Sequence, residues 1–257
     1  MDNLYGLCKG GQMACINRRL LREPLAQLLR RVVFRAGDRF MRQYFFNPVV
    51  QDRVGREQFF FNAFKALSFN GISGDYVEFG SGWGRTLALA YKESVRHCHP
   101  VNLWTFDSFK GLPPPEDTQD EHPRWREGQF ATSLDEFQAS CAAQGVPREA
   151  YTVVPGFFAD TLTSMSPTDP PQDVALAYVD CDLYSSTKSV LDFLAPRLKH
   201  GMILALDDYF NWGPAQIAGE RRALVEFLGS GTHWDLLPYL KIGWHGMSFV
   251  VEDRRVL

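Results

Sequence analysis

Short apolar runs, each followed by a longer amphipathic segment, recur along this 257-residue chain. Short apolar runs bounded by turn residues are typical of strands that are buried on both faces of a parallel sheet. The last two runs lie close together and indicate a hairpin. The predicted strands are residues 75–79, 101–106, 151–154, 174–179, 202–206, 234–240 and 246–251.

Helical segments separate these runs, near residues 85–97, 133–144 and 218–227. Strand–helix alternation of this kind predicts an α/β fold, a Rossmann-like, doubly wound, mostly parallel sheet of seven strands. The terminal hairpin would add an antiparallel strand. Residues 111–131 are rich in proline and charge, and we expect either an active-site lid or a disordered excursion there.

The N-terminal region has a helical pattern. Apolar residues over 12–36 recur at a spacing of three or four, with a break or restart at Pro24. A second stripe, over residues 59–67, is most simply part of the core. We therefore predict an N-terminal helical cap in residues 1–70 and a single α/β domain in residues 71–257.

Charge is distributed unevenly along the chain, whose formal net charge is −3. Residues 1–57 carry eleven Lys and Arg against five acids, whereas the remainder carries 16 against 25. A basic helical segment of this kind most simply keeps its arginines in solvent. Binding to nucleic acid or to an anionic membrane is the alternative, but we expect neither partner.

Targeting and redox signals favour a cytoplasmic protein. The chain contains no apolar run of about 18 residues, which a membrane-spanning helix requires. Arg18, Arg19 and Arg22 occupy the place of the apolar core of a signal peptide. The five cysteines are scattered without a CxxC spacing, which argues against a zinc site and against a disulfide framework.

Two acidic pairs follow two neighbouring predicted strands. Asp180 and Asp182 come after the fourth run, and Asp207 and Asp208 come after the fifth. The ends of parallel strands meet at one edge of the sheet, so four carboxylates should converge there. Carboxylates repel one another unless a cation or a proton lies among them.

These acids suggest metal chemistry. Asp180, Asp207 and Asp208 offer oxygen ligands to a hard cation such as Mg²⁺ or Ca²⁺. Asp182 would then be a free carboxylate beside the metal, able to take a proton from a metal-bound hydroxyl. The plainer interpretation is that Asp207 and Asp208 are turn formers and helix caps.

A glycine-rich turn joins the first predicted strand to its helix, with Gly80, Gly82 and Gly84 in alternate positions. Glycines allow close approach of a ligand to the backbone, and the helix N-terminus attracts an anionic group. The spacing is not the GxGxxG dinucleotide signature, since Arg85 stands where that signature needs glycine. A nucleoside that ends in an amino acid is therefore favoured over a nicotinamide cofactor.

Two further strand ends fit a nucleoside. Asp107 ends the second strand, where an acid can accept hydrogen bonds from both ribose hydroxyls; a turn cap is its structural alternative. Gly156, Phe157 and Asp160 follow the third strand, where Asp160 would face the amino group of an adenine.

Taken together, these segments resemble the macrocin/mycinamicin-type sugar O-methyltransferases. The matching segments, in the order of that family, are GDYVEFG at 74–80, FDSFKGLP at 106–113, GFFADTL at 156–162, VDCDLYSST at 179–187 and DDY at 207–209. The resemblance implies a Mg²⁺-dependent class I methyltransferase of natural-product biosynthesis. It implies S-adenosylmethionine as methyl donor and a hydroxyl of a sugar or other small polyol as acceptor.

The resemblance also implies roles for individual residues. Asp180, Asp207 and Asp208 would hold Mg²⁺, and Asp182 would be the general base. The N-terminal region would contribute to a lid or to a homo-oligomer. The implied cofactor-binding residues are Glu78, Gly80, Ser81, Gly82, Gly84, Thr86, Asp107, Ser108, Gly156, Phe157 and Asp160.

Two alternatives stay open from the sequence. The first is a catechol or phenol O-methyltransferase, which needs similar metal chemistry. The second is a non-catalytic nucleoside-binding interaction module with the same fold, but such a module has no need of four mutually repelling carboxylates.

Overall fold

The computed structural model describes residues 31–39, 41, 47–116 and 118–256. The chain forms two compact units, residues 1–51 and 52–257. In the first unit, residues 31–39 are helical; the rest of the helix predicted over 12–36 lies outside the described residues. The assignment of residues 1–70 as a cap stays a prediction.

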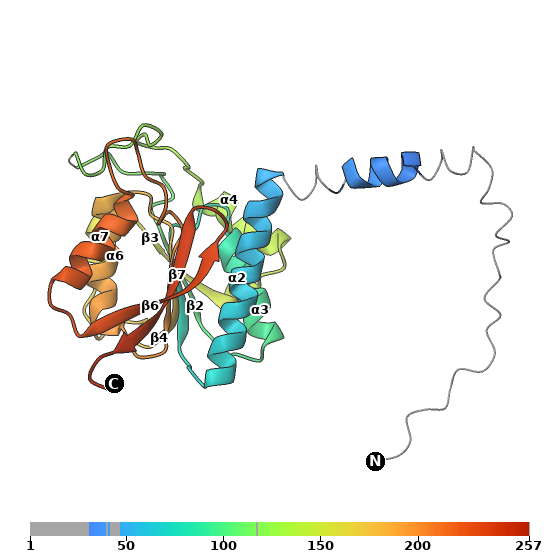
Figure 1. Ribbon diagram of the computed structural model, residues 1–257. Helices are drawn as coiled ribbons and strands as arrows, with labels where there is room; N and C mark the ends of the chain where they lie inside the picture. Colours follow the sequence, from blue (N-terminus) through green and yellow to red (C-terminus); the bar gives the residue numbers. More distant parts are fainter. Residues whose placement is uncertain (1–30, 40, 42–46, 117, 257) are drawn as a thin grey trace, which may run out of the picture. The chain divides into compact units, whose positions relative to one another are not determined.

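The second unit is built on one seven-stranded sheet, as the alternation of apolar runs predicts (Figure 1). The strand order is β3-β2-β1-β4-β5-β7-β6. The first five strands in this order run parallel, and β7 is antiparallel to both of its neighbours. The strands are β1 (Asp75–Phe79), β2 (Leu103–Asp107), β3 (Tyr151–Pro155), β4 (Val174–Val179), β5 (Ile203–Leu206), β6 (Trp234–Ile242) and β7 (Gly246–Asp253).

Helices cover both faces of this sheet (Figure 1). The helices α6 and α7 pack on one face; α2, α3 and α4 pack on the other. This confirms the doubly wound architecture. The described helices of the second unit are α2 (Pro48–Asn70, which begins in the first unit), α3 (Arg85–Arg96), α4 (Leu134–Ala143), η2 (Arg148–Ala150), α5 (Phe158–Thr161), α6 (Tyr184–Leu194), η3 (Ala195–Arg197) and α7 (Gly219–Gly229).

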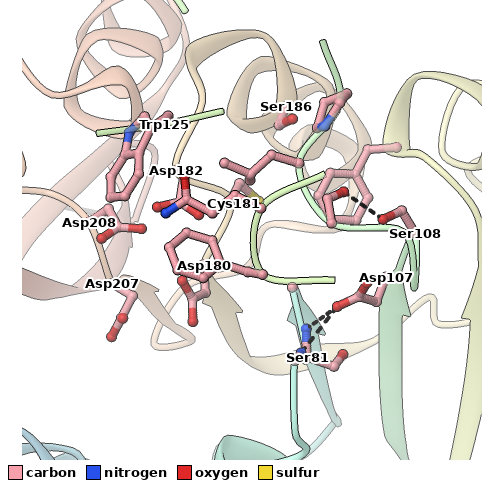
Figure 2. Close-up of a pocket in the computed structure, with 18 of the residues that line it drawn as sticks. Ser81, Asp107, Ser108, Trp125, Asp180, Cys181, Asp182, Ser186, Asp207 and Asp208 are labelled. Atoms are coloured by element: carbon pink, nitrogen blue, oxygen red, sulfur yellow. Dashed lines mark hydrogen bonds between the residues drawn. The ribbon is translucent and has the colours of Figure 1, made fainter. Parts of the chain in front are cut away.

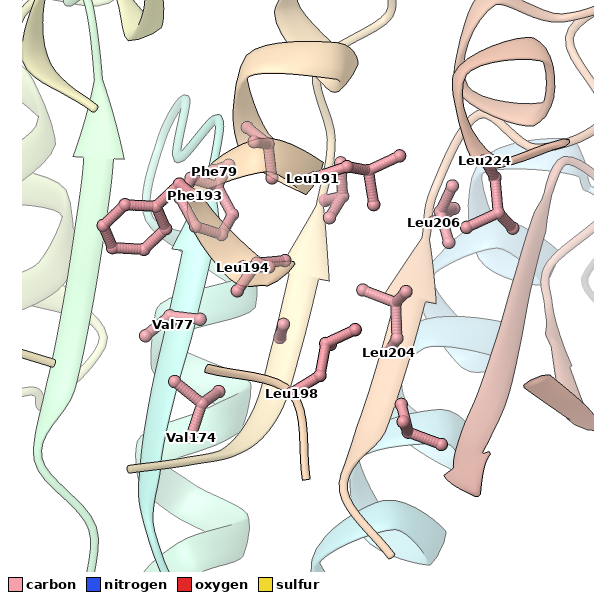
Figure 3. Close-up of a cluster of buried hydrophobic side chains, with 14 of the residues drawn as sticks. Val77, Phe79, Val174, Leu191, Phe193, Leu194, Leu198, Leu204, Leu206 and Leu224 are labelled. Atoms are coloured by element: carbon pink, nitrogen blue, oxygen red, sulfur yellow. The ribbon is translucent and has the colours of Figure 1, made fainter. Parts of the chain in front are cut away.

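The core consists of two apolar layers because successive side chains of a strand point to opposite faces. Val77 and Phe79 of β1 pack with Leu191 and Leu194 of α6 in the first layer (Figure 3). Tyr76, on the other face of β1, packs against the aromatic residues of α2. The α2 residues buried in this second layer are Phe59, Phe60, Ala63, Phe64 and Leu67. The aromatic stripe is therefore core, as its spacing predicts.

The strand order reverses between β1 and β4, because β1 connects outward to β2 and β3 whereas β4 begins the other half. Ligands of open α/β sheets bind beyond the carboxyl ends of the strands at such a switch point. The predicted glycine turn follows β1, and the predicted acidic pairs follow β4 and β5. The topology therefore puts all three at one edge of the sheet.

Two further sequence predictions concern membrane-spanning helices and the cysteines. None of the helices in the described part of the chain is both long and apolar enough to cross a membrane. The thiols of Cys98, Cys141 and Cys181 are free, and Cys141 and Cys181 are buried.

Candidate active site

A cavity of about 640 Å³ lies at the carboxyl ends of the central strands (Figure 2). This volume is in the usual range for small-molecule sites. The sheet brings most of the predicted site residues to this one cavity. Those that line it are Gly80, Ser81, Gly82, Thr86, Asp107, Ser108, Gly156, Phe157, Asp180, Asp182, Asp207 and Asp208.

The carboxylates of Asp180, Asp182 and Asp208 lie together on one side of the cavity (Figure 2). Each offers one oxygen, and these oxygens lie within 4.8 Å of one another. Burial, and then the charge of neighbouring acids, raises the pKa of all three carboxyl groups well above the ordinary value. The cluster therefore holds protons or a cation in preference to three free negative charges.

Asp207, the fourth predicted acid, has protein partners of its own. Its carboxylate pairs with Arg56 of α2 and accepts a hydrogen bond from the Tyr178 hydroxyl. Arg56 also pairs with Asp52, which lies 2.7 Å from Nε2 of His245. The other ring nitrogen of His245 hydrogen-bonds to the backbone oxygen of Asp207. Asp207, Asp208 and His245 form a second group with ligand atoms within 4.8 Å, so Asp208 belongs to both.

Unpartnered oxygen atoms in the cavity fit a hard cation. Oδ2 of Asp208 and Oδ1 of Asn211 are buried and have no hydrogen-bond partner among the described residues. A buried acceptor without a partner costs about 1–3 kcal/mol. Mg²⁺ and Ca²⁺ prefer carboxylate and amide oxygens as ligands. The donor set therefore suits such a cation.

Asp107 fixes the glycine turn. Its Oδ2 accepts hydrogen bonds from the backbone N–H groups of Ser81 (2.7 Å) and Gly82 (3.1 Å), and its Oδ1 accepts one from Phe109 (2.7 Å). The turn-cap interpretation is thus realised. A carboxylate has about four acceptor positions, so Asp107 keeps capacity for a ligand hydroxyl in the cavity that it lines.

The loop over residues 111–131 covers part of the cavity, and Trp125 is among its lining residues (Figure 2). Asp120 holds this loop, because its buried carboxylate accepts hydrogen bonds from Ser185 N–H (2.9 Å) and Glu116 N–H (3.0 Å). Because Asp120 holds it at the start of α6, this loop is ordered around Asp120 and forms one side of the cavity.

Three predicted residues do not line the cavity. Gly84 is the N-cap of α3 at φ 65°, where an added Cβ would lie 2.5 Å from Sγ of Cys141, so it serves the packing of α3 on α4. Asp160 is exposed in the first turn of α5. Glu78 is fully buried behind the glycine turn.

Glu78 supports that turn from inside the sheet. It accepts hydrogen bonds from the hydroxyls of Tyr76 (2.8 Å) and Thr105 (3.1 Å). Burial raises the pKa of Glu78 to about 7, and hydrogen bonds from Tyr76 and Thr86 oppose the rise.

The elevated pKa of Glu78 predicts a pH-dependent stability. Between pH 4.5 and 7 the unfolded chain releases this proton while the folded protein keeps it, so the free energy of unfolding falls as pH rises. The expected loss across this window is about 3 kcal/mol, at 1.36 kcal/mol per pKa unit. Urea denaturation of wild type and Glu78→Gln at pH 5.0, 6.0, 7.0 and 8.0 measures the effect.

The difference between the two stability curves isolates Glu78 from the other buried acids. We expect Glu78→Gln to be flatter up to pH 7 and parallel to wild type above it. Parallel curves throughout would mean that Glu78 is ionised in the folded protein at every pH tested.

Arg56 and His245 contact the acidic residues but were not predicted from the sequence. Arg56 had one available signal: it precedes Phe59 and Phe60 by three and four residues, so it continues the buried stripe of α2. No sequence pattern indicates a role for His245, because its contact with Asp52 joins residues 193 positions apart.

Two solved structures of methyltransferases have the same fold. The structure of the O-methyltransferase NovP matches with a TM-score of 0.63 at 24% identity, over 77% of this chain and 79% of NovP. The calicheamicin methyltransferase CalS11 matches with a TM-score of 0.63 at 22% identity, over 89% and 93% of the two chains. This chain therefore shares its seven-stranded α/β fold with these two enzymes.

The sequence comparison identifies the family. The family described as macrocin O-methyltransferase (TylF) matches residues 49–225, and the chain belongs to this enzyme family. This confirms the resemblance carried by the strand-end motifs.

Two curated relatives are O-methyltransferases. The mycinamicin III 3''-O-methyltransferase of Micromonospora griseorubida is 30% identical over 64% of this chain and 69% of its own length. The 8-demethyl-8-(2,3-dimethoxy-alpha-L-rhamnosyl)-tetracenomycin-C 4'-O-methyltransferase of Streptomyces olivaceus is 33% identical. In that second case the chain spans only about half, 54%, of the relative's length.

Proposed function

We propose that this protein is an S-adenosylmethionine- and Mg²⁺-dependent O-methyltransferase that acts on a hydroxyl of a sugar moiety or similar natural-product polyol. The observation that carries the proposal is the group of half-buried Asp180 and Asp182 with buried Asp208 in the same cavity as the glycine turn. A methyl donor and a cation-bound acceptor would thereby share one cavity. Membership of the macrocin O-methyltransferase family supports the reaction type.

The cofactor would occupy the half of the cavity formed after β1, β2 and β3. The turn from Gly80 to Gly82 would face its methionine end, with Thr86 at the start of α3. The free acceptor capacity of Asp107 suits a ribose hydroxyl. Gly156 and Phe157 line the side where an adenine would lie.

The cation would occupy the half formed after β4 and β5. Asp180 and Asp208 would be its ligands. Asp207, the third predicted ligand, would bind the cation when its ion pair with Arg56 breaks. The oxygens of Asp208 and Asn211 without partners support a ligand at this position. A bound divalent cation would supply Lewis acidity, which lowers the pKa of an acceptor hydroxyl.

Asp182 would be the general base. Its carboxylate lies in the same group as Asp180 and Asp208, so a hydroxyl held there would be within its reach. Asp182 would take the proton of the acceptor hydroxyl, and S-adenosylmethionine, when bound, would supply the methyl group from its sulfonium sulfur. A base whose pKa lies nearer the working pH performs this step best, and burial raises the pKa of Asp182 in that direction.

Alignment of donor and acceptor in the cavity would supply much of the rate. An in-line methyl transfer depends on holding two reactants in alignment. The tether from Asp120 to the start of α6 keeps the covering loop over the cavity.

The named substrates of the two relatives, a rhamnosyl tetracenomycin and mycinamicin III, favour a glycosylated acceptor here.

Calorimetry with the full chain tests this proposal directly. S-adenosylmethionine should bind in both Mg²⁺ and EDTA, and Mg²⁺ should give its own isotherm. Asp180→Asn should lose the Mg²⁺ isotherm, because it removes one charge from the cluster, and should keep cofactor binding. An acceptor screen with glycosylated polyols and with catechols then separates sugar from phenol specificity. No cofactor binding in wild type would refute the methyltransferase assignment.

A further inference from the structure

Glu220, in the first turn of α7, hydrogen-bonds to two loops. One follows β4 and carries Asp180 and Asp182, and the other follows β5 and carries Asp207 and Asp208; they are called the two acidic loops below. Its side chain is completely buried. Oε1 accepts a hydrogen bond from the backbone N–H of Cys181 at 3.1 Å, and Oε2 accepts one from the backbone N–H of Asp208 at 2.8 Å. One carboxylate thus connects the loop after β4, between Asp180 and Asp182, to the loop after β5.

The adjacent Gly219 allows this close approach of α7. A Cβ at this position would lie 2.7 Å from the backbone nitrogen of Tyr184 and 3.1 Å from the carbonyl oxygen of Asp182. A side chain there would push the helix away from the loop that carries Asp182. The start of α7 is therefore fitted to the backbone of this loop.

The loop held by Glu220 has an unusual conformation. Asp182 has φ 60°, in the left-handed region that costs a non-glycine residue about 1–2 kcal/mol. Such a conformation persists only when the surroundings fix it. The hydrogen bond to the N–H of Cys181 fixes the residue directly before Asp182.

The burial of Glu220 lowers the stability of the fold, so stability alone does not explain this residue. In the described part of the chain it forms no ion pair, and its neighbours on α7, Ala223 and Leu224, belong to the apolar core. A buried carboxylate without a cationic partner costs several kcal/mol. The two backbone hydrogen bonds offset part of this cost, and their targets are the acidic loops themselves.

We propose that Glu220 is a positioning residue that fixes the spacing of the two acidic loops for cation binding. It acts through the backbone of Cys181 and Asp208, and it is not among the residues that line the cavity. This inference rests on the cation site of the proposed function. Second-layer residues of metal sites typically change metal affinity by about 10–100-fold when replaced.

The substitution Glu220→Gln tests the role with little change of volume. An amide has one acceptor oxygen, so one of the two backbone N–H groups would face another donor. We expect the dissociation constant of Mn²⁺, measured from the electron paramagnetic resonance signal of the free ion, to rise about 10-fold or more. S-adenosylmethionine affinity by calorimetry should stay within about twofold.

Two further variants complete the experiment. Glu226→Gln, on the exposed side of the same helix, makes the same change of residue and should leave Mn²⁺ affinity unchanged. Glu220→Asp keeps both oxygens but is one methylene shorter, so it should also weaken Mn²⁺ binding, and it remains informative if Glu220→Gln does not fold.

The outcomes separate this inference from the proposed function. Wild-type Mn²⁺ affinity in folded Glu220→Gln or Glu220→Asp would overturn the role of Glu220 alone. Equal loss of Mn²⁺ and cofactor binding in both variants would mean that Glu220 stabilises the whole fold, and this result would also overturn the proposed positioning role. Failure of wild type to bind Mn²⁺ would refute the cation site, and the inference with it.

Discussion

Replacement of Asp182 by asparagine should lower kcat by about 10²–10⁴-fold, the usual contribution of a general base. The substitution keeps the size of the side chain, and asparagine tolerates the left-handed backbone that Asp182 adopts at φ 60°. The loop should therefore stay in place. The substitution removes the capacity to accept the hydroxyl proton and one negative charge from the group with Asp180 and Asp208, so Mn²⁺ affinity is measured beside kcat.

Single-turnover methylation of an acceptor from the screen, followed by mass spectrometry, measures this effect. Cofactor binding by calorimetry should be unchanged in Asp182→Asn. Asp192→Asn is the matched control, because Asp192 is exposed on α6 and pairs with Lys188 away from the cavity. A kcat within about threefold of wild type for Asp182→Asn would exclude Asp182 as the base.

The sheet could be predicted from the sequence because its strands are buried on both faces. Such a strand needs a continuous apolar run, and β4 (Val174–Val179) is buried at every position. The hairpin of β6 and β7 was predictable for a different reason: two runs joined by a short turn pair with each other. Both signals are local in sequence.

The acidic group was predictable because parallel strands end at the same edge. Asp180 and Asp208 follow adjacent strands, so their convergence depends only on topology. The partners of Asp207 were not predictable in this way. Arg56 reaches Asp207 from a helix 151 residues earlier, and that contact depends on how α2 lies against the sheet.

The exposure of individual side chains was also beyond sequence reasoning. Glu78 lies one position before Phe79 and two before Gly80, in a motif that the resemblance assigns to the cofactor. It points to Tyr76 and Thr105 inside the sheet. In a strand, a shift of one residue reverses the face to which a side chain points, so a motif alone does not decide which members touch a ligand.

The site depends in addition on close contact between β1 and β4. The residue after β1 is Gly80, with φ 85°, and a Cβ at this position would lie 1.9 Å from the carbonyl oxygen of Asp180. We expect Gly80→Ala to lower the free energy of unfolding by about 3–5 kcal/mol, from left-handed strain together with overpacking. Urea denaturation at constant pH measures it.

Gly82→Ala is the matched control in the same turn. Gly82 has φ 46°, but an added Cβ would meet no atom within 4 Å. Strain alone should cost this variant about 1–2 kcal/mol. Because the obstructing atom belongs to Asp180, Gly80→Ala should also weaken Mn²⁺ binding, whereas Gly82→Ala should not. Equal losses of stability in the two variants, with Mn²⁺ binding intact in both, would show that the contact between Gly80 and Asp180 does not constrain the acidic site.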